Sequence, residues 1–427
     1  MSDKRILILG ASKDQIPMIQ LAKKLGFYTI TADFNADAPG KSIADEFHLV
    51  SIRDEEKVEL LAKELNVDGI TSMITEAGVL SIFHSCQNLG LPNTYSLKSA
   101  QATVSKERMR EILEDNGIND LPFSLPNSLS SAEIFAREHG FPLVLKSSDS
   151  GGQNGLFKVN TIEELRHFFS LSKADSLGQK VILEEFVEGP ELNVVYTVYD
   201  GQIKDFIITD RIKDEEAFGI VKRHQYPSIF SQHIFENLKA KCQAITDALE
   251  IKNAVVFPQF IYSKEKNEAT LLEIGVRIPG GIMDQLLELA TGIDLQKFVF
   301  DIALGQIQTY ESYRSSPATS HAMVTFFNAE PGPLLTGKID HYSGIQKAKL
   351  IPQVANLDFF FQTEENLAIT PLKKGKDRFF YVVTYGDSSK QAHEASKDVF
   401  EQIRFYSANG DELMKQNFKF DEFYSHE

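Results

Sequence analysis

The segment LLEIGVRIPGG, residues 271–281, places a carboxylate and a guanidinium four residues apart at the end of an apolar run. In an extended strand alternate side chains share a face, so Leu271, Glu273, Gly275 and Arg277 are expected to point the same way. A carboxylate can bind a metal ion, and a guanidinium can stabilise charge that develops on a transferring phosphoryl group or an acyl oxyanion.

A second oxygen-bearing side chain is expected beside this carboxylate. The segment NAVVFPQFIYSKEKNEATLLEIGVR has the pattern of a β-hairpin that turns near Lys266, which places Gln259 opposite Glu273 on one face. Mg²⁺ takes oxygen ligands, usually one or two from protein, and phosphates and water complete its shell. The alternative is a cross-strand polar pair beside a surface arginine.

A lysine followed by a glycine-rich loop suggests phosphate binding. Lys146 ends the apolar run FPLVLK, and SSDSGGQNG follows with Gly151, Gly152 and Gly155. Loop amides can surround an anion while the ammonium neutralises it. The segment lacks the Lys-Ser/Thr ending of a Walker A motif, and an ordinary turn remains the alternative.

The segment VILEEFVEGPE combines an apolar strand with several carboxylates. Strand backbone exposed at such a break can pair with an adenine edge, and a carboxylate such as Glu191 can hold ribose hydroxyls. For Glu185 and Glu188, a solvated strand edge is the favoured explanation.

Composition excludes several classes of protein. The chain has 427 residues and a net charge of −16, with 60 acidic against 44 basic residues, which argues against a nucleic-acid-binding surface. No apolar run approaches the roughly 20 residues that span a bilayer. Cys86 and Cys242 form neither a disulfide framework nor a metal-ligand spacing, and the N-terminus lacks the pattern of a signal peptide. We therefore expect a soluble, cytoplasmic protein without nucleic-acid or membrane partners.

The first 95 residues alternate strands with helices, in KRILILG, IPMIQLAKKLG, FYTITAD and EEKVELLAKELNVDGITSMI. This order predicts an α/β domain with a doubly wound parallel sheet. The dinucleotide fingerprint is incomplete, because the second and third glycines after Gly10 are missing, although Asp33 lies near the usual position of the ribose-binding acid.

Residues 96–309 have an α+β pattern. The segment SKERMREILEDNGI predicts a helix with Ser105 as N-cap and Gly117 as stop signal, and Asp200-Gly201 predicts a hairpin turn. Residues 310–427 hold the alternating segments HAMVTFFNA and RFFYVVTYGD and the helical segment KQAHEASKDVFEQIRF. We expect them to form a smaller α+β domain that packs against or caps the middle one.

The order of these parts resembles the ATP-grasp superfamily over essentially the whole chain. It runs from Lys106 through Lys146, the segment EEFVEGPE and Gln259 to LLEIGVR. The resemblance implies an N-terminal doubly wound (pre-ATP-grasp) domain at 1–95 and a two-lobed ATP-grasp domain at 96–309, with a lid lobe at about 118–188. A small C-terminal domain at 310–427 completes this arrangement, with ATP held between the two lobes.

The resemblance also implies roles for individual residues in nucleotide binding. The implied ATP-binding residues are Lys106, Lys146, Gly151, Gly152, Glu184, Glu185, Phe186, Val187 and Glu191. Of these, the two lysines contact phosphates, residues 184–187 form the adenine hinge mostly through backbone, and Glu191 holds the ribose.

The same resemblance makes Glu273 and Gln259 metal ligands and Arg277 the catalytic residue that steadies an acylphosphate and a tetrahedral intermediate. Two departures from the family pattern concern this site: a Glu is usual at Gln259, and an Asn at Gly275. A neutral amide oxygen attracts Mg²⁺ less than a carboxylate does, so we expect one well-bound ion and a weaker second one.

The continuation Arg-x-Pro-Gly-Gly is similar to the branch of L-amino-acid (dipeptide) ligases. Biotin-dependent carboxylases carry a catalytic Glu where this chain has Gly281, which disfavours carboxylation. In the ligase branch Gly280 and Gly281 let backbone approach the substrate, and His224, in KRHQYPS, lines the pocket. Glu76 could reach the same cleft, but an acid at a helix N-terminus is the favoured explanation for it.

The implied activity is an ATP-dependent ligase that activates a small carboxylate as an acylphosphate and joins it to an amine, releasing ADP and phosphate. Its cofactors are ATP and Mg²⁺, with Mn²⁺ as an alternative metal, and homodimers are common among such enzymes. Two alternatives remain open. One is a purine-pathway or carbamoyl-phosphate-like enzyme, and the other is a nucleotide-binding regulatory protein with weakened catalysis, which Gln259 and Gly275 keep open.

Overall fold

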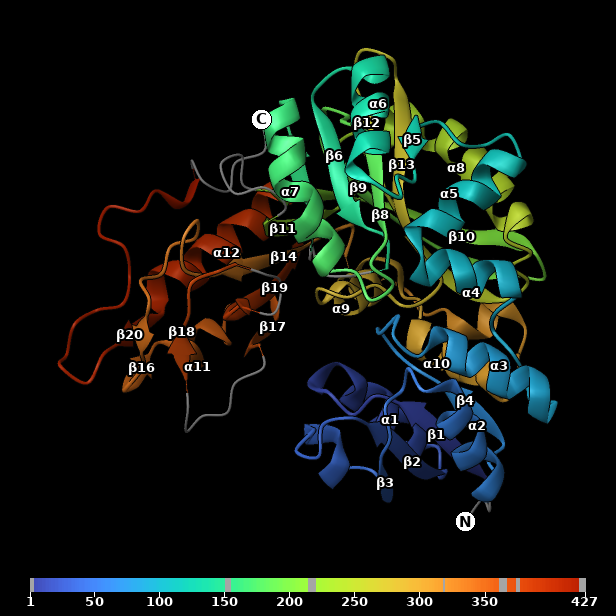
Figure 1. Cartoon of the computed structure of the whole chain (residues 1–427). Helices are drawn as coiled ribbons and strands as arrows, with labels where there is room; N and C mark the ends of the chain where they lie inside the picture. Colours follow the sequence, from blue (N-terminus) through green and yellow to red (C-terminus); the bar gives the residue numbers. More distant parts are fainter. Residues whose placement is uncertain are drawn as a thin grey trace.

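The computed structural model describes residues 4–149, 155–213, 220–317, 319–360, 367–373 and 377–421 (Figure 1). Its N-terminal part is a parallel sheet in the order β3-β2-β1-β4 with helices packed around it, which confirms the predicted doubly wound sheet. The elements are β1 (Arg5–Leu9), α1 (Ile16–Lys24), β2 (Tyr28–Asp33), β3 (Glu46–Leu49), α2 (Glu55–Glu64), β4 (Gly69–Thr71) and α3 (Val79–Leu89), with short 3₁₀ turns η1 (Lys13–Gln15) and η2 (Pro39–Ser42).

Asp33 has a structural use in this domain. Its carboxylate accepts hydrogen bonds from the amides of Ala11 at 2.8 Å and Asn35 at 2.9 Å. It therefore fixes the loop after β1, which accounts for an acid at this position without a dinucleotide.

A helix from much later in the chain covers one side of the N-terminal sheet. In α10 (Leu295–Ala303), the carbonyl oxygen of Ala303 lies 2.2 Å from the point where a Cβ on Gly69 would be. Only glycine permits this approach, so the N-terminal sheet and α10 are packed in direct backbone contact.

The region predicted as the lid lobe, called the lid below, holds an antiparallel sheet in the order β5-β8-β6-β7, with two helices on one face (Figure 1). Its elements are β5 (Phe123–Ser124), α6 (Leu129–His139), β6 (Leu143–Ser147), β7 (Phe157–Val159), α7 (Ile162–Ala174) and β8 (Val181–Glu185). Leu143, Leu145 and Leu183 pack against the helices in a small core. Because side chains alternate along a strand, Lys146 and Glu184 point to the other face.

An antiparallel sheet of eight strands forms the centre, in the order β13-β12-β9-β10-β11-β14-β19-β17. Its strands are β9 (Glu191–Tyr199), β10 (Gln202–Lys213), β11 (Val221–Tyr226), β12 (Ala254–Ser263), β13 (Glu268–Gly275), β14 (His321–Phe327), β17 (Val354–Phe359) and β19 (Phe380–Gly386). The helices that pack on it are α4 (Leu97–Val104), α5 (Lys106–Asp115), α8 (Ser231–Ala248), α9 (Met283–Thr291) and α10.

The two faces of the central sheet belong to different cores. Val194 and Tyr196 pack with α5 and α8, whereas Val195, between them in β9, packs with α9 and α10. The odd-numbered residues of β9 therefore face α9, and this face also carries the polar residues of the site.

The C-terminal region continues the central sheet, because β14 pairs directly with β11. It adds α12 (Ser389–Gln402) and a core of its own, which contains Phe327, Phe380 and Phe405. The remaining elements are η3 (Tyr310–Tyr313), β15 (Gly337–Lys338), β16 (His341–Ser343), α11 (Ile345–Ala348), β18 (Ala368–Ile369) and β20 (Arg404–Tyr406). Strands from both sides of the predicted boundary at 309/310 therefore belong to one hydrogen-bonded sheet.

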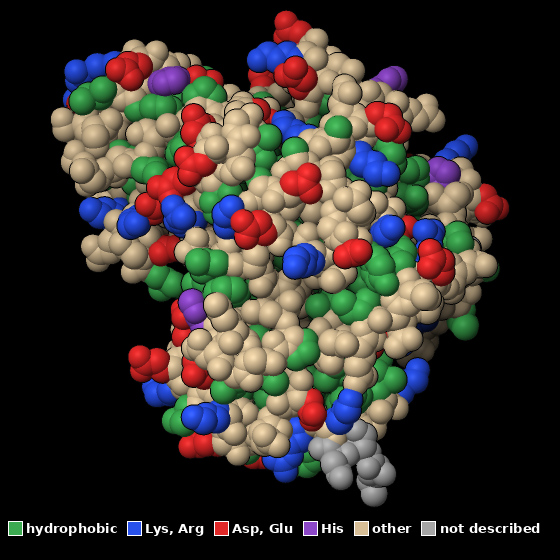
Figure 2. Space-filling view, turned by 90° about the vertical axis from the view of Figure 1, so that its right-hand side faces the viewer, with side chains coloured by type: hydrophobic (Ala, Val, Ile, Leu, Met, Phe, Trp, Pro, Cys, Tyr) green, Lys and Arg blue, Asp and Glu red, His purple; other side chains and the backbone are tan. Residues whose placement is uncertain are grey.

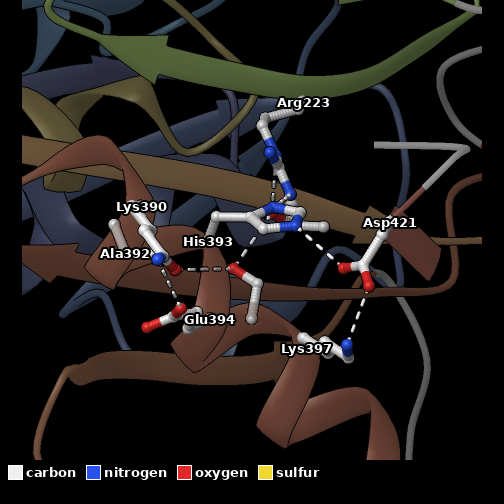
Figure 3. A network of polar contacts seen from close by, with 9 residues as sticks. Arg223, Lys390, Ala392, His393, Glu394, Lys397 and Asp421 are labelled. Atoms are coloured by element: carbon white, nitrogen blue, oxygen red, sulfur yellow. Dashed lines mark hydrogen bonds and ion pairs between the residues drawn. The ribbon is translucent and has the colours of Figure 1, made fainter. Parts of the chain in front are cut away.

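A polar network ties α12 to this sheet (Figure 3). Arg223, buried in β11, lies 2.9 Å from Nδ1 of His393, whose Nε2 lies 3.2 Å from Asp421. Lys397 donates to the other oxygen of Asp421 at 2.7 Å, so two residues of α12 hold Asp421 in place.

Among the described residues, no helix is both long and apolar enough to cross a membrane. Figure 2 shows acidic and basic side chains interspersed over one face of the molecule. Cys86 and Cys242 are both buried, and burial raises the pKa of the Cys86 thiol to about 12.

Candidate active site

A cavity of about 470 Å³ lies where the N-terminal domain, the lid and the central sheet meet. Glu76 enters it from the N-terminal domain, and Asp149 lies on the lid side. Lys106 comes from the start of α5, while Glu273 and Arg277 come from β13 and the loop after it. Three of the predicted site residues therefore share one cavity.

The predicted hairpin is confirmed at the position of Gln259 and Glu273. Gln259 in β12 pairs directly with Glu273 in β13, so the two side chains share a face. The side chain of Glu273 is 46% exposed, so its carboxylate is accessible to a metal ion.

A β-bulge interrupts this hairpin immediately beyond Gln259, where Phe260 pairs with Leu271. The extra residue shifts the alternation, so Leu271 is buried in the same core as Ile274 and Val276. The prediction that Leu271 shares the face of Glu273 was wrong for this reason.

Arg277 is held by a residue of the N-terminal domain. Its Nε and Nη2 donate to Oε1 of Glu76 at 3.1 and 2.5 Å, and its guanidinium lies 5.7 Å from the ring centroid of Phe257. Glu76 precedes α3 without belonging to it, and its side chain points into the cavity. The favoured explanation of Glu76 as a helix-terminal acid was therefore wrong, and the cleft position is correct.

Lys106 occupies the first position of α5, where Ser105 caps the helix as predicted. Its backbone amide donates to the carbonyl of Ser148 in the lid at 2.9 Å. Its ammonium lies 4.0 Å from the carboxylate of Glu273. The start of α5 thus connects the lid to the metal-ligand candidate.

Lys146 and Glu184 form a buried ion pair on the inner face of the lid. The Lys146 ammonium lies 2.5 Å from Oε2 of Glu184, and Nε of Arg110 donates to Oε1 at 2.8 Å. Burial alone would raise the pKa of the Glu184 carboxyl, but Arg110 and Lys146 outweigh it and hold the pKa at about 2. The Glu184 side chain therefore orients the lysine, while its backbone lies within the sheet, paired with Phe123 of β5 and Val144 of β6.

The sequence interpretation missed Arg110. It is fully buried on α5 beside Met109 and Leu113, and its Nη2 donates to the carbonyl of Leu271 at 2.7 Å. A charged residue among the apolar positions of an amphipathic helix was the available signal, since such a group is buried only with partners.

The segment after β8 presents backbone at the edge of the lid. The amides of Glu185 and Phe186 donate to the carbonyls of Pro122 and Pro142, each at 3.2 Å. The amide of Val187 makes no hydrogen bond with any residue that the structure describes. The ammonium of Lys158 lies 3.8 Å from the ring centroid of Phe186, and the Glu185 carboxylate lies 2.7 Å from His139.

Glu191 is engaged by two cations. Its carboxylate is buried and contacts Arg211 and Lys213, both on the neighbouring strand β10. Burial opposes ionisation, but these two charges prevail and lower the pKa of Glu191. A ribose hydroxyl bound by Glu191 would therefore have to share its carboxylate oxygens with Arg211 and Lys213.

His224 lies buried on β11, with Nδ1 3.1 Å from the side-chain amide of Asn193. Burial and the charges of Arg378 and Arg211 hold its pKa well below the usual value. A Cβ on Gly281, whose φ is +73°, would lie 3.1 Å from Nε2 of His224, so this loop needs glycine there.

Gly280 lies one residue earlier in the same loop, beside Ile74 of the N-terminal domain. The predicted phosphate-loop residues Gly151 and Gly152 lie outside the described residues. Among the described residues, no group of three His, Cys, Asp or Glu side chains could hold a metal ion. The paired oxygens of Glu273 and Gln259 fit Mg²⁺ only with phosphate and water as further ligands.

Comparison with known proteins agrees with this geometry. Residues 105–309 match the family model of the carbamoyl-phosphate synthase L chain, ATP binding domain. The formate-dependent phosphoribosylglycinamide formyltransferase of Prochlorococcus marinus (strain NATL1A) is 24% identical over 250 residues, which are 58% of this chain and 64% of that protein. The match thus spans less than two thirds of that relative's length.

Solved structures share the fold over nearly the whole chain. The L-amino acid ligase of Bacillus licheniformis has a TM-score of 0.79 at 18% identity and covers 96% of this chain and 100% of its own. The biotin carboxylase domain dimer of the Hydrogenobacter thermophilus 2-oxoglutarate carboxylase, in complex with MgADP and bicarbonate, has a TM-score of 0.73 at 18% identity. It covers 97% of this chain and 92% of its own. Residues 105–309 thus match an ATP-binding domain family, and the chain as a whole shares the ATP-grasp fold of these structures, as the sequence resemblance predicted.

Proposed function

We propose that this protein is an ATP-dependent ligase that activates a small carboxylate as an acylphosphate and joins it to an amine, releasing ADP and phosphate. The observation that carries the proposal is the convergence of Lys106, Glu273 and Arg277 in one cavity. A cation, a metal-ligand candidate and a guanidinium are the groups that offset charge during transfer of a phosphoryl group.

ATP lies, in this proposal, between the lid and the central sheet. Lys106 and Lys146 neutralise its phosphates together with the loop of Gly151 and Gly152. The amide of Val187, which has no hydrogen-bond partner among the described residues, donates to the adenine edge, in a hinge of residues 184–187, and Glu191 faces the ribose. Glu184 keeps the ammonium of Lys146 in place through their ion pair.

Glu273 and Gln259 would hold Mg²⁺ together with phosphate oxygens, and Mn²⁺ is an alternative because it accepts the same ligands. Bound there, the metal supplies charge neutralisation at the phosphates. Lys106, 4.0 Å from Glu273, adds a positive charge to the same place. We propose a single well-bound ion, since Gln259 contributes no charge.

Arg277 would stabilise the oxyanion of the acyl-transfer step, and Glu76 would hold its guanidinium in position. Gly280 and Gly281 would bring backbone amides to the substrate, with His224 behind them. We assign His224 to pocket lining, since its depressed pKa keeps it neutral near pH 7.

The relatives support this class of reaction. Formate, named for the Prochlorococcus marinus enzyme, is a carboxylate, and the amino acids named for the Bacillus licheniformis ligase carry both a carboxylate and an amine. We also propose the domain boundaries 95/96 and 309/310, a homodimer, and cytoplasmic location.

The test is phosphate release with ATP and Mg²⁺ against a matrix of amino acids and small carboxylates, with nucleotides separated by chromatography. We expect ADP and phosphate only with a particular pair of carboxylate and amine, and release slowed about 10²–10³-fold in Arg277→Ala. AMP and pyrophosphate would overturn the acylphosphate mechanism. ATP binding without turnover across the matrix would favour the regulatory protein instead.

A further inference from the structure

Three hydrogen bonds fix the guanidinium of Arg110. Nε donates to Oε1 of Glu184 in the lid at 2.8 Å, and Nη2 donates to the carbonyl of Leu271 in β13 at 2.7 Å. Nη1 donates to the side-chain oxygen of Asn119, in the loop after α5, at 3.4 Å. A planar guanidinium with an acceptor at each nitrogen is held in one orientation. Arg110 is therefore a fixed positive charge inside the protein.

Lys146 holds the same carboxylate less rigidly. Its ammonium lies 2.5 Å from Oε2 of Glu184, whereas Arg110 binds Oε1. Within the described part of the chain, Glu184 is the only hydrogen-bond or ion-pair partner of this ammonium. The Lys146 side chain is 12% exposed, on the inner face of the lid. Its flexible four-carbon stem can turn the ammonium toward a bound group without displacing Arg110.

Glu184 needs a cation at all times, because it is charged and buried. Its side chain is 1% exposed, and although burial opposes ionisation, Arg110 and Lys146 keep the pKa of its carboxyl at about 2. If Lys146 were the only partner, turning its ammonium toward a phosphate would leave a buried carboxylate unpaired, which is costly. Because Arg110 stays on Oε1, Lys146 can leave Oε2 at a smaller cost.

Arg110 also connects the two lobes that enclose the proposed nucleotide site. Its helix α5 packs against β13 at the edge of the central sheet, and Glu184 belongs to β8 of the lid (Figure 1). The carbonyl that Arg110 binds is that of Leu271, two residues before the metal-ligand candidate Glu273. One guanidinium therefore links the strand of Glu273 to the carboxylate that holds Lys146.

We propose that Arg110 is a positioning residue for ATP: by neutralising Glu184 and tying it to β13, it frees the ammonium of Lys146 for the phosphates. Arg110 itself does not touch the nucleotide, since its side chain is fully buried and each of its nitrogens has an acceptor in the protein. The identity of the ligand rests on the proposed function, whereas the division of Glu184 between a fixed and a movable cation rests on the contacts above.

The test compares ATP with adenosine, which lacks the phosphates that Lys146 would contact. Calorimetry of the full chain with Mg²⁺ measures the dissociation constants of a non-hydrolysable ATP analogue and of adenosine, at a temperature where each variant is folded. Arg110→Met should weaken binding of the analogue at least tenfold, because Glu184 then retains Lys146 as its one cation. The affinity for adenosine should stay unchanged, whereas loss of a merely structural contact would weaken both ligands alike.

A second variant removes the carboxylate together with the guanidinium. In Arg110→Met/Glu184→Gln no buried anion holds Lys146, so affinity for the ATP analogue should return to within about threefold of the wild type. Replacing both partners also avoids the buried charge that Arg110→Met leaves with one cation fewer. Arg137→Met, on the exposed surface of α6, is the matched control and should bind both ligands like the wild type.

Three results would overturn the positioning role of Arg110. They are an unchanged affinity for the ATP analogue in Arg110→Met, an equal weakening of the analogue and adenosine, and a double variant that binds the analogue no better than Arg110→Met.

The outcomes separate this role from the ligase function. Analogue binding that falls in Arg110→Met and recovers in the double variant, without turnover of any substrate pair by the wild type, would support the positioning role and refute the ligase. Turnover by the wild type, with an analogue affinity that Arg110→Met does not change, would refute the positioning role and leave the ligase. A wild type that binds no ATP analogue would overturn both.

Discussion

The carboxylate of Glu76 holds the guanidinium of Arg277, with Oε1 3.1 Å from Nε and 2.5 Å from Nη2. The two residues are 201 positions apart, Glu76 after β4 of the N-terminal sheet and Arg277 after β13 of the central sheet. Because both line the same cavity, the orientation of Arg277 depends on how the N-terminal domain is docked on the central sheet.

Glu76→Gln should lower kcat about tenfold without changing the dissociation constant for ATP. The amide keeps an acceptor but loses its charge, so the guanidinium is held less firmly. Arg277→Ala should lose about 10²–10³ in kcat, as when one transition-state donor is removed. Steady-state rates and nucleotide titration measure both effects. An equal loss of ATP affinity in Arg277→Ala would place that residue in nucleotide binding or in the fold.

Gln259→Glu should strengthen Mg²⁺ binding about tenfold, because a carboxylate replaces a neutral amide opposite Glu273. The dissociation constant for Mg²⁺ in the presence of an ATP analogue measures this change. Gln259→Ala is the matched variant and should weaken binding only a few-fold. If the Glu variant binds Mg²⁺ no better, Gln259 does not face the metal.

Arg110→Met should destabilise the protein by about 3–5 kcal/mol at neutral pH, since it leaves Glu184 buried with one cation fewer. The urea midpoint measures the loss. Arg137→Met, on the exposed face of α6, is the control and should change stability by less than about 0.5 kcal/mol. A similar shift of the urea midpoint in both variants would mean that the buried ion pairs stabilise the protein no more than the exposed one.

The same ion pairs predict that the stability of the protein depends on pH. The pKa of Glu184 is about 2 in the folded protein, below its usual 4.5. The stabilisation, on the order of 3 kcal/mol, is therefore complete above about pH 4.5 and is lost as the pH falls toward 2. The difference in urea midpoint between wild type and Arg110→Met should narrow over this range. A constant difference would contradict the assignment.

Asp284→Asn should stabilise the protein increasingly as the pH rises through 6. Burial at the start of α9 raises the pKa of Asp284 to about 6 from its usual 3.8. The protonated form is favoured in the folded state, so its contribution is complete below about pH 3.8 and lost as the pH rises through 6. The melting-temperature difference from wild type should grow over this range and then level off.

The local parts of this structure could be predicted from the sequence. Ser105 caps α5, and Asp200 and Gly201 form the turn between β9 and β10 with positive φ. Gln259 faces Glu273 because a hairpin joins residues that are close in the chain. Such features depend on short-range geometry, which side-chain type and spacing specify. The bulge beyond Gln259 was not predictable in this way, since no residue type requires it there.

Only the tertiary structure decided which distant side chains meet. Arg110 and Glu184 are 74 positions apart, and Arg378 reaches His224 and Gly281 only because β14 and β19 join the central sheet beside β11. Periodicity predicts which face of an element is buried, but the docking of domains determines its partner. The sequence therefore predicted that Gln259 faces Glu273, and the packing of distant parts of the chain decided that Glu76 holds Arg277 and that Arg378 lies beside Gly281.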